Sequence, residues 1–436
     1  MTAGERSGAL EDAFMNMEQN KPGDPDSSFD TDGVFSLSKF PPEFHADRLI
    51  KGLALQRDAK IVFAAGLFRD EAFVYALARL NSNGTLDDDF AGQGVTYGNF
   101  LKDKPATGGK VVIQPDGKIL LLGATLSGTD GWLHLAMARY LETGVIDESF
   151  GEKGHLIIEN IGDKKFREDS DTLRVLDDGC LLISANFESP DNPDFLRSAV
   201  FRFTPDGVPD TRFNGTGRLD FQASTSSPYT RINTCLAQGN KILLAGHALI
   251  DGLDKAYIAR LEANGSLDKT FNCASQTPGL LILRIDERNT AFDDLARRSD
   301  GTLIGIGRVG DAFEKTKQGL LLAITPNGDP HLMFNNGNPL LTKLNNEDGT
   351  HWNCGYSQPD GCIVTVSGSY PLHIARFLPN GVIDIGFGSS GFITLDTHTA
   401  SEPIQLCRHT DNRVLFSNNN VGLGERGIGL IRRYLG

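Results

Sequence analysis

A two-part motif recurs along this chain at intervals of roughly sixty residues. One copy reads QPDGKILLLG at residues 114–123, and Ala138-Arg139-Tyr140, the turn Thr143-Gly144, Asp147 and Phe150 follow it. Recurrence at a fixed interval indicates a repeat architecture, in which each unit is one small supersecondary structure that needs its neighbours to bury its apolar face.

The first half of each copy predicts a tight turn between two strands. It consists of Asp-Gly, or a close relative, followed by a short apolar run. Asp-Gly favours a two-residue hairpin turn because both residues tolerate positive φ. The copies start at Asp58, Asp116, Asp178, Gly239, Asp300, Asp360 and Asp411.

The second half of each copy ends a strand and adds another turn. Most copies read Arg, then a turn such as Asn-Gly, then Asp and Phe, with Arg79, Arg139, Arg202, Arg260 and Arg376 and with Asp87, Asp147, Asp210, Asp268 and Asp384. The fifth copy departs from this pattern and has His331 where Asp is expected. The short apolar runs between the turns give four strands per unit, and four-stranded units repeated radially predict a β-propeller.

The two ends of the sequence complete one further unit. The C-terminal residues 431–436 carry the Arg part of the motif without its turn and last strand, and residues 22–37 carry that missing part, including Asp26 and Phe29. We therefore expect an N-terminal strand to join the C-terminal blade, which closes the ring and leaves no open edge. The prediction is an all-β fold: a seven-bladed β-propeller with four antiparallel strands per blade.

The motif resembles the delta-60 repeat family of bacterial proteins, and the resemblance covers residues 22–436. It implies a propeller fold but no particular reaction, because that family has no single known activity. Residues 1–21 are expected to form a flexible tail. An alternative for this segment is a short helix that contains Leu10, Phe14, Met15 and Met17.

Charge and composition narrow the classes of partner. The net charge is −14 and the pI is near 5.1, which argues against nucleic acid as a partner. No stretch is long and apolar enough to cross a bilayer, and the first residues lack the apolar core of a signal peptide. We expect no membrane insertion and a cytoplasmic location, with export by a route without a cleaved signal left open.

The sequence offers no recognisable metal, cofactor or nucleophile motif. Its six cysteines include no C-x-x-C pair, and neither H-E-x-x-H nor G-x-S-x-G occurs. The recurring Asp residues suggest repeated calcium sites at first sight, but a residue present in nearly every unit serves a need that all units share. We expect these Asp residues to cap turns and the recurring Arg residues to pair with them. No cofactor and no metal are expected.

The variable segments predict one functional face. They connect the second strand of a blade to the third, at residues 124–134, 187–197, 247–255 and 308–318, or the fourth strand to the next blade, at residues 38–48, 98–109, 160–171, 222–231 and 338–351. Irregular loops on a rigid frame are the usual place for binding.

Polar residues that open each innermost strand are expected to surround the channel mouth on that face. The predicted ligand-binding residues are Arg48, Lys110, Asp171, Arg231, Asp294, His351, Trp352 and Glu402, with Lys51, Arg174 and Asp293 beside them. Charged groups could orient the hydroxyls of a sugar or another polar ligand, and Trp352 could stack on it. No catalytic residue is assigned.

Three functions are consistent with these observations. The leading hypothesis is a non-enzymatic binding or scaffolding module for a protein or a glycan. A lyase or hydrolase requires His351 and the nearby carboxylates Asp171, Asp293, Asp294 and Glu402 to converge within hydrogen-bond distance, and a scattered arrangement would count heavily against it. A structural subunit of a larger assembly predicts a flat apolar patch on the outer or the plain face.

Overall fold

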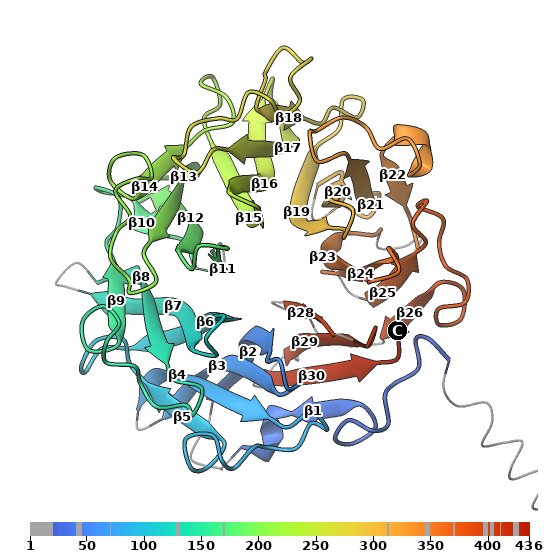
Figure 1. Cartoon of the computed structure of the whole chain (residues 1–436). Helices are drawn as coiled ribbons and strands as arrows, with labels where there is room; N and C mark the ends of the chain where they lie inside the picture. The colour runs from blue at the N-terminus through green and yellow to red at the C-terminus, as the bar shows by residue number, and fades with distance from the viewer. Residues whose placement is uncertain are drawn as a thin grey trace, which may run out of the picture.

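The chain forms a ring of seven antiparallel blades around a common axis (Figure 1). The computed structural model describes residues 21–40, 46–69, 71–127, 131–168, 171–311, 314–344, 349–368, 371–395, 400–401, 405–409, 411–421 and 427–436. The expected N-terminal tail lies outside these residues except for Lys21. Within the described ranges, no helix is long and apolar enough to span a membrane.

Successive strands build successive blades, as Figure 1 shows. Blade 1 contains β2 (Ala46–Leu55), β3 (Ile61–Arg69), β4 (Ala72–Leu80) and β5 (Val95–Gly98). Blade 2 contains β6 (Ala106–Ile113), β7 (Ile119–Ser127), β8 (Trp132–Tyr140) and β9 (His155–Ile158). Blade 3 contains β10 (Lys165–Phe166), β11 (Thr172–Val175), β12 (Leu181–Ser189), β13 (Asn192–Phe203) and β14 (Arg218–Phe221). Blade 4 contains β15 (Thr230–Gln238), β16 (Lys241–Ile250), β17 (Leu253–Leu261) and β18 (Leu280–Ile282).

The remaining blades follow the same plan. Blade 5 contains β19 (Thr290–Arg297), β20 (Leu303–Val309), β21 (Gln318–Ile324) and β22 (Leu340–Thr342), and blade 6 contains β23 (Trp352–Ser357), β24 (Ile363–Ser367), β25 (Leu372–Phe377) and β26 (Phe392–Leu395). Blade 7 contains β27 (Ala400–Ser401), β28 (Gln405–Arg408), β29 (Val414–Val421) and β30 (Ile428–Tyr434), together with β1 (Val34–Ser36). The helical elements in the described ranges are two 3-10 turns, η1 (Leu37–Lys39) and η2 (Asn335–Gly337).

The expected closure of the ring is confirmed. Strand β1 pairs antiparallel with β30, and Phe35 lies opposite Ile431. Arg433 donates from Nε to Asp26 Oδ2 at 2.7 Å. The N-terminal strand therefore supplies the outer strand of the last blade, as the divided motif predicts.

The core lies mainly between blades. One buried cluster joins Leu77 of blade 1 to Leu121 of blade 2. The motif Phe90 is fully buried under the next blade, where Gly144 has a φ of +85° and an added Cβ would lie 2.9 Å from the Phe90 ring. Gly is required at this turn because the ring of the preceding blade occupies the space of a side chain.

Four of the recurring arginines join their own blade to the next one: Arg79, Arg139, Arg202 and Arg260. Arg139 donates from Nε to Asp147 Oδ2 at 2.8 Å and from a terminal nitrogen to the Pro205 carbonyl of blade 3 at 2.5 Å. The other carboxylate oxygen of Asp147 accepts from Ser149 N at 3.2 Å and caps the turn. The predicted structural roles of the repeated Asp and Arg are thus confirmed, because one ion pair fixes both a turn and a blade interface.

Blade 5 keeps this link with different residues. Ala323 and His331 occupy the positions of Arg and Asp, and their backbones keep the hydrogen bond from His331 N to Ala323 O at 3.1 Å. Arg298, after β19, instead donates to the Pro379 carbonyl of blade 6 at 2.8 Å and lies over Phe334. In the fifth copy, a guanidinium from a different position, Arg298, therefore makes the contact with the next blade.

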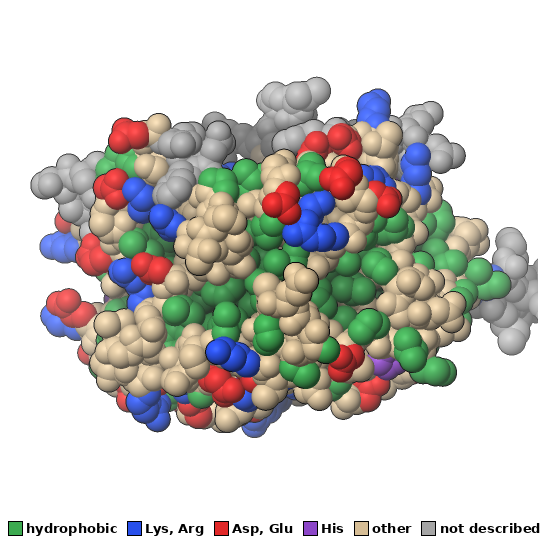
Figure 2. Space-filling model, turned by 90° about the horizontal axis from the view of Figure 1, so that it is seen from above, with side chains coloured by type: hydrophobic (Ala, Val, Ile, Leu, Met, Phe, Trp, Pro, Cys, Tyr) green, Lys and Arg blue, Asp and Glu red, His purple; other side chains and the backbone are tan. Residues whose placement is uncertain are grey.

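The connections on the predicted functional face are partly regular. Residues 187–197 and 247–255 lie almost entirely in hairpins, because β12 ends at Ser189, β13 begins at Asn192, β16 ends at Ile250 and β17 begins at Leu253. The expectation of irregular loops is wrong for these two segments. Seen from above in Figure 2, the rim of the ring carries hydrophobic side chains along its middle and charged side chains nearer its two faces.

Candidate ligand-binding site

A β-bulge near the start of the innermost strand positions polar side chains close to the axis. The register shifts between Ile50 and Gly52 in β2, between Gly108 and Val111 in β6, and at equivalent points of β15, β19 and β23. A bulge re-aims one side chain relative to the regular alternation of a strand. The bulged residues in β15, β19 and β23 are Asn233, Asp293 and Asn353.

Asp293 is the centre of a group that we call the axial cluster: Arg167, Arg231, His247, Asp293, Arg308 and His351. His351 Nε2 lies 2.9 Å from Asp293 Oδ2. One terminal nitrogen of Arg308 donates to both carboxylate oxygens, at 3.1 and 3.0 Å. Burial alone would raise the pKa of Asp293, but Arg308 and His351 hold it well below its ordinary value. Asp293 therefore stays ionised and joins blade 5 to blade 6.

His247 extends the cluster into blade 4. It lies opposite Arg231 in the β15–β16 pairing, and the edge of its ring faces Tyr229 at a centroid distance of 6.2 Å. The Tyr229 hydroxyl donates to Asp254. Burial lowers the pKa of His247 to about 4, and Arg308 and Arg231 act in the same direction. His247 is consequently neutral near neutral pH.

Arg231 has a guanidinium for which the described residues supply no hydrogen-bond or ion-pair partner. Burial, Arg167 and Arg308 lower the pKa of its guanidinium, while Asp293 acts in the opposite direction. Within the described ranges, this guanidinium has no hydrogen-bond or ion-pair partner, and its Nε is buried. Arg308, by contrast, is engaged by Asp293, and Arg167 lies 3.6 Å from Glu188. A half-buried guanidinium without a partner is suited to an anionic group of a ligand.

The predicted residues thus divide into two sets. Arg231 and His351 come together through their shared neighbour Asp293. Asp294 turns away from the cluster, since its carboxylate accepts from Thr234 Oγ1 at 3.2 Å and from Gly355 N at 3.1 Å. Burial raises the pKa of Asp294, and its contacts serve to connect blades 4, 5 and 6.

The other predicted residues lie around the axis in different blades. Lys110 is half-buried in the bulge of β6, and Asp171 is buried before β11. Lys51 of blade 1 donates to Glu168 of blade 3 at 2.7 Å, which links two blades that are not adjacent. Arg48 lies in β2, where its backbone pairs with Ile428, but its side chain is not among the described parts. Glu402 lies outside the described residues.

Trp352 does not have the position expected of a stacking platform. Its side chain is 0% exposed and packs edge-on against Phe377 at a centroid distance of 5.9 Å, within the core between blades 5 and 6. His351 directly precedes β23, and Trp352 is the first residue of that strand. Their side chains point to opposite sides, so His351 reaches Asp293 while Trp352 enters the core. The predicted stacking role of Trp352 is therefore wrong.

The sequence interpretation missed Arg167, His247 and Arg308. Residues 247 and 308 were assigned to variable connections, whereas they lie in β16 and β20 opposite Arg231 and Ala291. His247 and Arg308 could have been found from their equivalent positions in the repeat. Each is a basic residue near the end of the second strand of its blade, opposite the first residues of the innermost strand. Among the described residues, no group of three His, Cys, Asp or Glu side chains is arranged to hold a metal ion.

Comparison with family models agrees with the repeat. Residues 56–90, 114–150 and 240–271 match a model described as a domain of unknown function (DUF5122) beta-propeller. These segments coincide with three copies of the motif, so they support a β-propeller repeat family, although they do not carry the narrower delta-60 name. Among curated proteins, no sequence matches the chain significantly.

Solved structures with the same fold are distant in sequence. The polysaccharide lyase Uly1 has a TM-score of 0.51 and 10% identity, with 90% of each chain covered. A protein of unknown function from Dyadobacter fermentans DSM 18053 has a TM-score of 0.46 and 14% identity, covering 75% of this chain and 93% of that one. An alpha-L-arabinofuranosidase from Fusarium graminearum has a TM-score of 0.46 and 12% identity, covering 74% and 90%. At these identities the likeness concerns the fold alone.

Proposed function

We propose that this propeller is a binding module that takes an acidic glycan at the axial cluster, with a ligand carboxylate on Arg231. The observation that carries the proposal is the half-buried guanidinium of Arg231, which has no partner in the described ranges. A guanidinium matches a carboxylate with two parallel hydrogen bonds, and burial strengthens such a pair.

The surroundings of Arg231 favour a sugar acid over a simple anion. Asn233 lies on the same innermost strand as Arg231, His351 directly precedes the innermost strand of blade 6, and both carry polar side chains that can meet hydroxyl groups. Asp293 would repel a second negative charge placed close to Arg308, so the site favours one carboxylate at a time. A glycan that carries carboxylates separated by hydroxyl groups fits this arrangement of one available guanidinium beside polar side chains.

The test is calorimetric titration of the full chain with a galacturonate hexamer and with its methyl ester. The ester keeps the size and the hydroxyls but removes the charge. We expect binding of the acid alone, and Arg231→Gln should weaken it by roughly 10- to 100-fold, because hydrogen bonds to charged groups contribute about 1.5–3 kcal/mol. Arg218→Gln, at a 43% exposed side chain on β14, is the matched control. Equal affinity of wild type and Arg231→Gln would refute the site.

A second candidate is a lyase or hydrolase that uses His351. One observation favours it: His351 and Asp293 lie 2.9 Å apart. The convergence that the sequence hypothesis requires is met by this carboxylate but not by Asp294, which accepts from Thr234 and Gly355 instead. An ionised Asp293 could orient the imidazole so that its other nitrogen accepts a proton from substrate. The likeness to a polysaccharide lyase adds no residue-level support, so this candidate depends on the His351–Asp293 pair itself.

Turnover of the same hexamer distinguishes the two functions. An enzyme should release shorter or unsaturated products, and His351→Gln should remove turnover while hexamer binding persists. A binding module should bind the hexamer and leave it intact after prolonged incubation. Product analysis by mass spectrometry gives the answer without assuming the reaction type.

A further inference from the structure

Comparison of the seven blades shows an unusual exposed apolar surface on blades 5 and 6. Two residues separate the motif Asp from the motif Phe, and in five blades both are polar or charged: Ser27-Ser28, Asp88-Asp89, Glu148-Ser149, Thr211-Arg212 and Lys269-Thr270. Blade 5 has Leu332-Met333 and blade 6 has Ile385-Gly386. Leu332, Met333 and Ile385 are 73%, 78% and 78% exposed. Since five blades fold with polar residues there, the fold itself does not require apolar ones.

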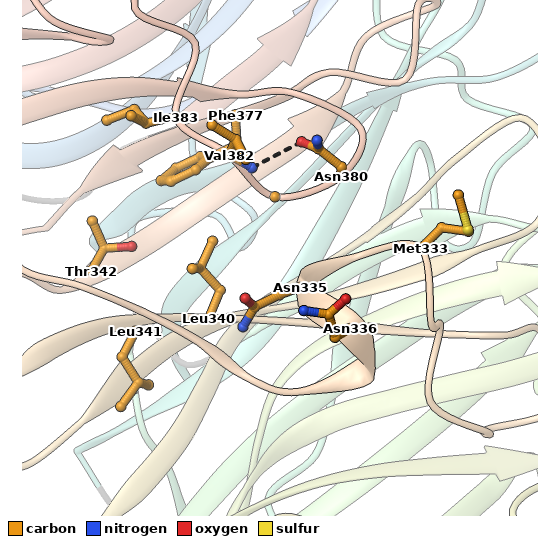
Figure 3. A pocket seen from close by; sticks show the side chains of 11 residues that line it. Met333, Asn335, Asn336, Leu340, Leu341, Thr342, Phe377, Asn380, Val382 and Ile383 are labelled. Carbon is orange, nitrogen blue, oxygen red and sulfur yellow. Dashed lines mark hydrogen bonds between the residues drawn. The ribbon is translucent and has the colours of Figure 1, made fainter.

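A groove lined by Met333 lies between blades 5 and 6. It has a volume of about 490 Å³, and its apolar walls include Met333 and Leu340 of blade 5 and Phe377, Val382 and Ile383 of blade 6. Figure 3 shows Met333, Asn336 and Leu340 on one side of it and Val382 and Asn380 on the other. Val382 is 56% exposed, and its backbone N–H donates to Asn380 Oδ1 at 3.0 Å. The result is an apolar groove with amides at its rim, of a size typical of ligand pockets.

The first described residues contact blade 6, which also forms one wall of this groove. Gly388 N donates to the Pro22 carbonyl at 2.8 Å, and an added Cβ on Gly23 would meet Gly388 at 2.5 Å. Ile385 lies in the same loop, between Gly388 and the groove residue Ile383. Residues 1–20 therefore precede a point that is fixed on blade 6, one loop away from the groove.

The N-terminal sequence contains an apolar pattern that matches the groove. Leu10, Phe14 and Met17 are spaced at i, i+4 and i+7, the spacing of anchors that enter an apolar groove from one face of a helix. Only residues 18–20 separate Met17 from Lys21, a span of roughly 10–14 Å when extended, and Leu10 lies within roughly 40 Å of chain length. A segment tethered so close binds at a high effective concentration.

We propose that residues 10–17 of the chain dock in this groove, with Leu10, Phe14 and Met17 covering Met333, Leu340 and Val382. The occupant is the chain's own N-terminal segment, in place of the flexible tail expected from the sequence. Its acidic residues, including Glu11 and Asp12, fall between the apolar anchors and would remain in solvent. The proposal is independent of the axial cluster, because different residues of different elements form the two sites.

Hydrogen–deuterium exchange on the full chain tests the docking. We expect amides of residues 10–17 to exchange at least tenfold more slowly than in Phe14→Ser or Met333→Glu variants. Val208→Glu, at a 59% exposed position of a repeat turn in blade 3, is the matched control and should leave the protection unchanged. Because Met333 is exposed and Phe14 precedes the first repeat motif in the sequence, neither variant should lower the melting temperature of the propeller by more than the control does.

Three results would overturn the proposal. Rapid exchange of residues 10–17 in the wild type would show that the groove does not hold them. Protection that survives Met333→Glu would place the segment elsewhere. Protection that grows with protein concentration, with a dimer in analytical ultracentrifugation, would mean that the groove receives the segment of a second copy.

Discussion

The link between Arg139 and Asp147 should be one of the most strongly coupled pairs in the ring. Arg139 is 2% exposed and donates to Asp147, to the Pro205 carbonyl of the next blade and to Ser149 Oγ at 3.1 Å. Three variants form a double-mutant cycle: Arg139→Met, Asp147→Asn, and both together. Met keeps the aliphatic contact with the Phe150 ring, over which the guanidinium lies.

The expected magnitudes follow from the partners that each variant leaves behind. Removing one member of a buried ion pair costs about 3–5 kcal/mol. Arg139→Met should cost about 3 kcal/mol, at the low end, because Asp147 keeps Lys118 at 3.3 Å and the backbone N–H of Ser149. Asp147→Asn should cost about 2 kcal/mol, since Arg139 keeps the Pro205 carbonyl. In the double variant neither charge is stranded, so we expect about 3 kcal/mol and a coupling energy of about 2 kcal/mol.

Urea denaturation followed by tryptophan fluorescence and circular dichroism measures this cycle, provided that the two probes give coincident transitions. For a chain of 436 residues, about 3 kcal/mol corresponds to a fall of only roughly 3 °C in Tm, so denaturant midpoints are the better readout. Costs that add within about 0.5 kcal/mol would refute the idea that the pair acts as one unit.

Other residues make equally direct tests. Trp352→Ala should lower the unfolding free energy by about 3–5 kcal/mol, because it empties a core position, whereas Trp132→Ala at a 41% exposed site should cost under about 1 kcal/mol; similar costs would contradict the burial of Trp352. Phe35→Ala should weaken ring closure by about 3–5 kcal/mol, with exposed Phe73→Ala as its control in the same denaturation assay. His247 has a pKa of about 4 in the fold and about 6.5 when unfolded. Below pH 6.5 the unfolded chain therefore binds the extra proton, so stability falls towards pH 4 by up to about 3 kcal/mol. His247→Gln should remove this part of the slope between roughly pH 4 and 7, and an unchanged slope would disprove the assignment.

The sequence predicts the fold well because its determinants are local. The turn residues and the apolar runs of each blade are consecutive, and the divided motif predicts that residues 22–37 complete the C-terminal blade. Both the seven blades and the closure by β1 follow from this information. The sequence also predicts the capping role of Asp147. An Asp that recurs at the same position in nearly every blade is expected to stabilise the shared fold.

The site is harder to predict because it depends on side-chain direction and on strands far apart in the sequence. Asp293 and Asp294 are neighbours with similar environments in the sequence, yet the bulge sends one to His351 and the other to Gly355. Alternation predicts that His351 and Trp352 point to opposite sides, but it does not say which of the two faces the axis. Arg308 approaches from a second strand, and no local pattern links it to residue 351.

The closure of the ring also has a consequence for synthesis. Asp26 and Arg433 lie 407 positions apart, so a ribosome adding about 5–20 residues per second needs roughly 20–80 seconds to supply the partner of the first strand. Throughout that time β1 has no β30 to pair with, and Phe35 has no Ile431 opposite it. The nascent chain must carry this unpaired apolar strand until β30 has been synthesised, so a product truncated before β30 would keep it exposed and available to other strands.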